Sequence, residues 1–196
     1  MEPMRNHVGT AMPLNRSDVD TDQIIPASWL RRVERTGFGE GLFSEWRKDP
    51  SFPMNQPEYA GATVIVAGPN FGVGSSREHA VWALMDRGFR AVISPRFGDI
   101  FRNNSTKTGL VPVVVPAEFA EELLLQVERN PHLEIHIDVE ARTVSAPQLE
   151  MTATFEMDDA TRYRLMNGLD DIGLTMQQVD EISEYESHRP SWMPHI

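Results

Sequence analysis

The stretch from residue 62 to residue 88 constrains the fold of this chain more than any other. It begins with the β-branched run ATVIVA (62–67), which predicts a buried strand, and continues through the glycine-rich turn GPNFGVG (68–74). The segment SSREHAVWALMDRG (75–88) then predicts a helix that ends at Gly88, because glycine commonly terminates helices. A strand, a glycine turn and a helix in this order are typical of an α/β protein.

The residues that follow continue the alternation. We expect a strand over RAVIS (90–94), a helix over GDIFRNNSTK (98–107) closed by Gly109, a strand over LVPVVV (110–115) and a helix over AEFAEELLLQVER (117–129). This order predicts a parallel or mixed sheet with covering helices. Next, LEIHIDVEARTVSA (133–146) alternates apolar and polar residues around a turn near Glu140, and TATFEM (152–157) repeats the pattern, which predicts a β-hairpin or meander. Two further helices are predicted over ATRYRLMN (160–167), closed by Gly168, and over TMQQVDEISEYE (175–186), with Thr175 as its cap.

The remaining segments have weaker patterns. Residues 14–26 (LNRSDVDTDQIIP) read as an extended polar segment with many turn-forming residues. Residues 27–61 lose periodicity and are rich in glycine and proline, so we predict a long loop that is either functional or mobile. The last residues (187–196) are predicted to be a tail. With 196 residues, the chain is expected to form one domain over 1–196.

Composition excludes several classes of function. No apolar run reaches the roughly 18 residues of a membrane span, and the N-terminus lacks the apolar core of a signal peptide, so a cytoplasmic protein with no membrane partner is expected. The net charge of −11 argues against nucleic-acid binding. The chain contains no cysteine, so an iron–sulfur or zinc–thiolate centre would have to come from another chain, and we predict no metal site in this one.

The run Gly68–His79 (GPNFGVGSSREH) is the candidate functional site. Gly72 and Gly74 allow a sharp turn, and Ser75 or Ser76 is predicted to cap the following helix, with Glu78 at capping-box spacing from Ser75. The helix N-terminus and Arg77 together favour a carboxylate or phosphate ligand.

Three other interpretations of this run stay open. The glycines and serines are also compatible with a purely structural turn. A dinucleotide-binding loop fits poorly, because no acidic residue follows the next strand, where Ser94, Pro95 and Arg96 stand. A serine hydrolase would pair Ser75 with His79, but the nucleophile-elbow motif is absent, and His79 is better explained as a packed helix residue.

Four segments of the chain carry a family resemblance: DVDTDQIIP (18–26), GSSREHA (74–80), FGDIFRNNSTKTGLVPV (97–113) and RYRLMNGLDDIGLT (162–175). In this order they resemble the swivelling domain of the aconitase family, and most closely its separate small subunits of about 200 residues. The resemblance implies a three-layer β/β/α swivelling domain. It also implies a hydro-lyase that interconverts 2-isopropylmalate and 3-isopropylmalate by dehydration and rehydration, in leucine biosynthesis.

The resemblance further implies roles for residues and partners. Ser75 would be the catalytic base. Gly74, Ser76 and Arg77 would bind a small dicarboxylate substrate, and Asp20, Thr21 and Asp22 would shape the edge of the site. Leu30 and Arg31 lie where the family has its specificity loop, together with Arg32 and Arg35. A large subunit would be the partner, and it would carry a [4Fe-4S] cluster.

Two other functions remain open from sequence. A related small subunit acting on homoaconitate or a methylated malate would differ around Leu30. A non-catalytic anion-binding module would keep the loop but have no activity with any partner.

Overall fold

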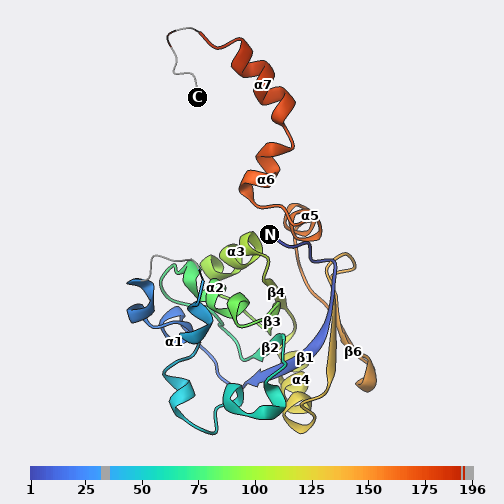
Figure 1. The fold of residues 1–196 in the computed structure, drawn as a ribbon. Helices are drawn as coiled ribbons and strands as arrows, with labels where there is room; N and C mark the ends of the chain where they lie inside the picture. Colours follow the sequence, from blue (N-terminus) through green and yellow to red (C-terminus); the bar gives the residue numbers. More distant parts are fainter. Residues whose placement is uncertain (32–35, 191, 193–196) are drawn as a thin grey trace.

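The computed structural model describes residues 1–31, 36–190 and 192. Within them, seven strands form one mixed sheet in the order β4-β3-β2-β1-β5-β6-β7. Strands β1 to β4 pair in parallel, whereas β5 pairs antiparallel with β1 and continues into β6 and β7. The chain is therefore an α/β protein with a mixed sheet and a β-meander, as the sequence predicts (Figure 1).

Most predicted elements are confirmed. The strands are β1 (Asn6–Leu14), β2 (Val64–Ala67), β3 (Ala91–Ser94), β4 (Val111–Val114), β5 (Glu134–Asp138), β6 (Thr143–Ala146) and β7 (Met151–Thr154). The helices are α1 (Thr21–Ile24), α2 (Glu78–Asp86), α3 (Asp99–Thr108), α4 (Ala117–Arg129), α5 (Asp159–Asn167), α6 (Asp171–Met176) and α7 (Val179–Ser187). Gly109 and Gly168 adopt left-handed backbone angles just after α3 and α5, which is how glycine ends a helix.

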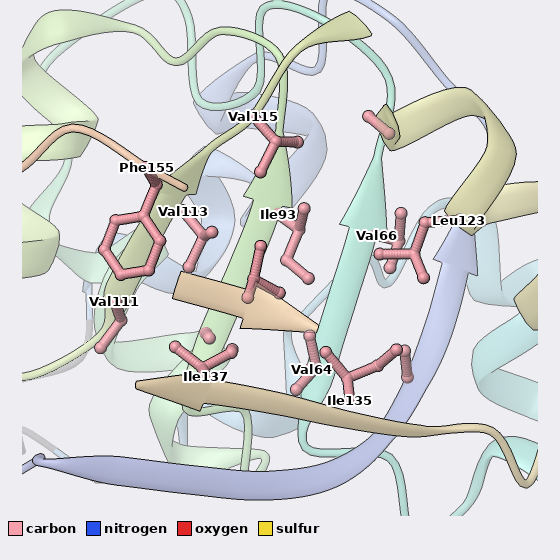
Figure 2. Close-up of a cluster of buried hydrophobic side chains, with 14 of the residues drawn as sticks. Val64, Val66, Ile93, Val111, Val113, Val115, Leu123, Ile135, Ile137 and Phe155 are labelled. Carbon is pink, nitrogen blue, oxygen red and sulfur yellow. The ribbon is translucent and has the colours of Figure 1, made fainter. Parts of the chain in front are cut away.

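Alternation along the parallel strands separates two hydrophobic cores. Val64 and Val66 of β2 face one core, which also contains residues of α4 and of the meander, such as Ile135 and Ile137. Figure 2 shows these side chains gathered together with Ile93, Val111, Val113 and Phe155. Ile65, between the two valines, faces the second core, which contains residues of α2, α3 and the 27–62 segment. The parallel strands are thus covered by the meander and α4 on one face and by helices on the other, which gives the predicted three-layer β/β/α fold.

Strand β1 is not predicted by the sequence. Its residues NHVGTAMPL contain glycine and proline and lack a β-branched run, so local propensity for a strand is weak. Its tertiary position stabilises it, because β1 pairs with β2 on one side and with β5 on the other. Gly9 fits there because a Cβ at that position would lie 2.0 Å from the Thr63 hydroxyl oxygen.

Two predicted helix caps are wrong. Helix α2 begins at Glu78 with Arg77 at the N-cap, so neither Ser75 nor Ser76 caps it and the predicted capping box does not form. Thr175 lies inside α6, which begins after Asp170, and α7 begins separately after Gln178. In both places a serine or threonine lies close to a helix start, but the first helical residue is a different one than the sequence predicts.

The described part of the 27–61 segment contains five short 3-10 helices, the first over Ala27–Arg31 and the last over Pro57–Tyr59. Three aromatic residues of this segment, Phe38, Phe43 and Phe52, are buried in the second core. The described part of this loop is therefore anchored by packing despite its lack of periodicity. Its predicted mobility stays a prediction. Of the predicted tail over 187–196, Ser187 ends α7, and residues 191 and 193–196 lie outside the described residues.

Two glycines bring the loop after β2 into close contact with the start of α3. Gly72 has a φ of +76°, and a Cβ there would lie 2.2 Å from Cγ of Phe101. A Cβ at Gly98 would lie 2.4 Å from the carbonyl oxygen of Gly72. Both positions exclude any side chain, so the loop can pack on α3 only because these residues are glycine.

We predict that Gly72→Ala lowers the free energy of unfolding by about 2–4 kcal/mol, since it combines a left-handed backbone with a steric clash. Urea denaturation of the wild type and the variant measures this difference in the free energy of unfolding. Gly61→Ala is the control, because no atom lies within 4 Å of its Cβ position, and it should change stability by less than about 0.5 kcal/mol. Equal effects of the two substitutions would contradict the prediction.

Candidate active site

The polar turn after β1 lies directly against the glycine-rich loop after β2. The Gly72 N–H donates to the Val19 carbonyl at 2.7 Å, and the Thr21 N–H donates to the Val73 carbonyl at 3.0 Å. Because β1 and β2 are parallel neighbours, their carboxyl ends meet at one edge of the sheet. Two segments about 50 residues apart in sequence, both predicted to belong to the site, are therefore brought together.

Asp20 and Thr21 have structural contacts in this turn. Asp20 caps α1 in a capping box: the Gln23 N–H donates to its carboxylate at 2.7 Å, and its own N–H donates to the Gln23 side chain at 2.9 Å. Thr21 is buried, and its hydroxyl donates to the Ser75 carbonyl at 2.9 Å. Thr21 therefore fixes the backbone of the residue that the sequence predicts as the base.

Arg77 is held by the same turn. Its guanidinium forms an ion pair with Asp22 and donates to the Ile25 carbonyl at 3.4 Å. The Arg77 side chain is only 16% exposed, whereas that of Asp22 is 56% exposed. The ion pair thus orients a largely covered cation at the rim of the loop, where a carboxylate ligand would bind beside Asp22 or replace it.

Gly74, Ser75 and Ser76 form the exposed tip of the loop. Gly74 has a φ of +92° and lies against the Asp20–Thr21 turn, with its Cβ position 3.5 Å from Cβ of Asp20. The tip immediately precedes the first turn of α2, where free backbone N–H groups and the helix dipole favour an anion. The structure therefore brings together seven of the predicted residues around this tip, namely Asp20, Thr21, Asp22, Gly74, Ser75, Ser76 and Arg77.

Leu30 and Arg31 lie at the end of the first 3-10 helix of the 27–61 segment. Leu30 is partly buried against the second core, next to Trp29, and Arg31 is exposed. Arg32 and Arg35 lie outside the described residues. A role of Leu30 and Arg31 in substrate choice stays a prediction.

An aromatic cluster beside the loop is not predicted by the sequence. His79 of α2 contacts Phe38 edge to face at 5.2 Å between ring centroids, and it contacts Trp82 at 4.7 Å. The Gly39 N–H also donates to Asp86 at 2.8 Å, which ties the 38–40 turn to α2. His79 is therefore a packed helix residue, as the sequence indicates. The spacing of His79 and Trp82, three residues apart on a helix, could have predicted their contact.

Comparison with known proteins identifies the fold family. The model of the aconitase C-terminal domain family matches residues 1–118, which contain both loops of the site. The chain belongs to this family. A second family model, which describes the C-terminal domain of the 3-isopropylmalate dehydratase small subunit, matches residues 171–195.

Relatives in the aconitase family extend over the whole chain. The 3-isopropylmalate dehydratase small subunit of Parafrankia sp. is 59% identical over 194 residues, covering 99% of this chain and 98% of the relative. That of Rubrobacter xylanophilus is 55% identical over 196 residues, covering 100% of both. The crystal structure of 3-isopropylmalate dehydratase from Methanocaldococcus jannaschii superposes with a TM-score of 0.69 at 27% identity, covering 91% of this chain and 99% of that one.

Membership of the aconitase family implies an iron–sulfur cluster, but the side chains of this chain are not suited to bind one. The sequence has no cysteine, and the described residues contain no group of three or more His, Asp or Glu side chains placed to hold a metal.

No helix in the described part of the chain is both long and apolar enough to cross a membrane.

We predict that Thr21→Val lowers the free energy of unfolding by about 1 kcal/mol and speeds amide hydrogen exchange at residues 74–77, because the Ser75 carbonyl loses its hydroxyl donor. Thr21→Ser keeps the donor and is the matched control. Unchanged exchange in Thr21→Val would show that this hydrogen bond does not fix the loop.

Proposed function

We propose that this chain is the small subunit of a hydro-lyase that interconverts 2-isopropylmalate and 3-isopropylmalate in leucine biosynthesis. The observation that carries the proposal is the full-length identity of 55–59% with proteins named as this small subunit. The loop geometry agrees with it, because an exposed serine and a positioned arginine suit a substrate that has an acidic C–H bond next to a carboxylate.

Ser75 is the proposed base that removes the proton alpha to a substrate carboxylate. A neutral serine hydroxyl is too weak a base for this step, so the base is the Ser75 alkoxide, which takes the substrate proton and becomes the hydroxyl. To form near neutral pH, this alkoxide needs hydrogen-bond donors and positive charge nearby. Two neighbouring features of the chain can stabilise the alkoxide: the backbone N–H groups at the start of α2 and the guanidinium of Arg77. Gly74, Ser76 and Arg77 are the proposed contacts to the carboxylates, while Asp20, Thr21 and Asp22 hold the loop in place.

The large subunit of the same enzyme is the proposed partner. Hydroxide is a poor leaving group, so the elimination also requires a Lewis acid, which a [4Fe-4S] cluster in the large subunit would supply. This chain would then carry out proton transfer and carboxylate binding, in an enzyme of the cytoplasm. Substrates such as homoaconitate are disfavoured, because the names of the relatives specify isopropylmalate.

An anaerobic assay tests the proposal. The chain is mixed with its organism's cysteine-bearing large subunit, reconstituted with iron and sulfide, and formation of the unsaturated intermediate from 3-isopropylmalate is followed by absorbance. Turnover is expected only in the mixture. Turnover of homoaconitate but not of 3-isopropylmalate would reassign the substrate, and inactivity with every hydroxy acid would favour the anion-binding module.

We predict that Ser75→Ala lowers kcat by about 100- to 10,000-fold while subunit association and stability stay unchanged, since the exposed hydroxyl does not cap α2. Steady-state kinetics and calorimetric titration of the large subunit measure both quantities. Ser145→Ala on β6, in the meander, should leave kcat unchanged. Activity retained in Ser75→Ala would exclude Ser75 as the base.

We predict that Arg77→Lys raises KM more than it lowers kcat, because lysine keeps the charge but cannot make the planar two-donor contact with a carboxylate. The measurement is the separate determination of KM and kcat for 3-isopropylmalate. A pure loss of kcat with unchanged KM would instead place Arg77 in transition-state stabilisation.

A further inference from the structure

Helices α6 and α7 form an arm that leads away from the body of the molecule (Figure 1). Neither helix contains a buried residue. Helices of six and nine residues are too short to be stable in water without packing, since isolated helices shorter than about 12–15 residues are marginal. The arm therefore needs contacts that the described residues of this chain do not provide.

The base of the arm is fixed to the body. Asp171 forms ion pairs with Lys107 of α3, at 3.3 Å, and with Arg164 of α5. Hydrogen bonds from Arg164 and Lys107 hold the pKa of the Asp171 carboxyl below its ordinary value. The arm thus starts from a defined position, whereas its outer helix α7 contains no buried residue.

Each helix of the arm exposes apolar side chains on one side. Ile172 is 74% exposed and Met176 is 58% exposed, and they are spaced four residues apart on α6. Val179, Ile182 and Tyr185 recur every third residue on α7, with Tyr185 65% exposed. On the other side of α7 lie Asp180, Glu181 and Glu184. This is the pattern of an amphipathic helix that binds in a groove.

The charge of the arm restricts what can cover it. Residues 170–187 contain six acidic residues and no lysine or arginine; the acidic residues are Asp170, Asp171, Asp180, Glu181, Glu184 and Glu186. A second copy of the arm would be repelled, and the whole chain carries a net charge of −11. An anionic lipid surface would be repelled for the same reason. The complementary surface is an apolar groove flanked by lysine and arginine side chains.

The arm also starts near the proposed active site. Asp171 and Ile172 line a surface pocket together with Glu78 and Trp82 of α2, and Glu78 directly follows Arg77. The base of the arm therefore lies against α2, the helix that follows the loop tip. The second family model, for the C-terminal domain of the small subunit, begins at residue 171, which is the first residue of α6.

We propose that the α6–α7 arm is a docking element that inserts its apolar side into a basic-rimmed groove on the large subunit. This inference rests on the proposed function, because that function names the partner. Docking would hold the two subunits together beside the loop that carries Ser75, and it would order the arm at the same time.

Binding of full-length variants to the cluster-reconstituted large subunit tests the proposal. The double variant Ile172→Ser/Tyr185→Ser should bind about tenfold more weakly or worse, with kcat unchanged at saturating large subunit. The charge variant Asp180→Asn/Glu184→Gln should bind more weakly and lose part of the salt dependence of binding. Leu125→Ser on α4, another exposed apolar residue, is the matched control and should bind like the wild type.

Wild-type affinity in the double variant would overturn the proposal, as would an equal loss in Leu125→Ser. Sedimentation of the chain alone tests whether the arm instead binds a second copy of this chain. Self-association that is abolished in Ile172→Ser/Tyr185→Ser would assign the arm to a second copy and overturn the proposal. A failure of the proposed function gives a different result. If the wild-type subunits bind each other but convert neither isopropylmalate isomer, the proposed function is refuted. The affinities of the variants still decide the role of the arm.

Discussion

The parallel pairing of β1 with β2 is the constraint on which the proposed site depends. It places the ends of both strands at one sheet edge, so that the turn at 18–22 and the loop at 68–77 join through backbone hydrogen bonds at Val19 and Thr21. β1 is also the strand at which the sheet changes from parallel to antiparallel, because its other side pairs with β5. One strand therefore holds the meander on one side and positions half of the candidate active site on the other.

The loop at 68–77 combines a rigid base with an exposed tip. Gly72 packs closely on Phe101, Gly98 packs on the backbone of Gly72, and the Thr21 hydroxyl holds the Ser75 carbonyl. Above this base, Ser75 and Ser76 stay exposed, while Arg77 is mostly covered and is oriented by Asp22. Such an arrangement fixes the backbone without enclosing the serine, which suits a site that is completed by a second protein surface.

The chemistry and the charge of this chain agree with the proposal that two subunits share the site. The chain lacks the cysteines of a cluster but presents a serine, an arginine and a helix N-terminus at one exposed edge. Its strongly negative charge would repel a dicarboxylate, so Arg77 has to offset that repulsion locally. The acidic arm leaving the body near the same edge extends the surface that a basic partner would cover.

Elements with strong local signals can be predicted from the sequence alone. The strand at 64–67, helices α3 and α4, the β5–β6 hairpin and the glycine ends of α3 and α5 follow from periodicity and backbone preference, and the loop residues 74–77 follow from a family resemblance. Other features follow only from tertiary contacts: the strand formed by residues 6–14, the start of α2 at Glu78, the Asp22–Arg77 ion pair and the contact of His79 with Phe38. The reason is physical: most of these features depend on partners about 40 or more residues away in the chain, and local propensity carries no information about such contacts.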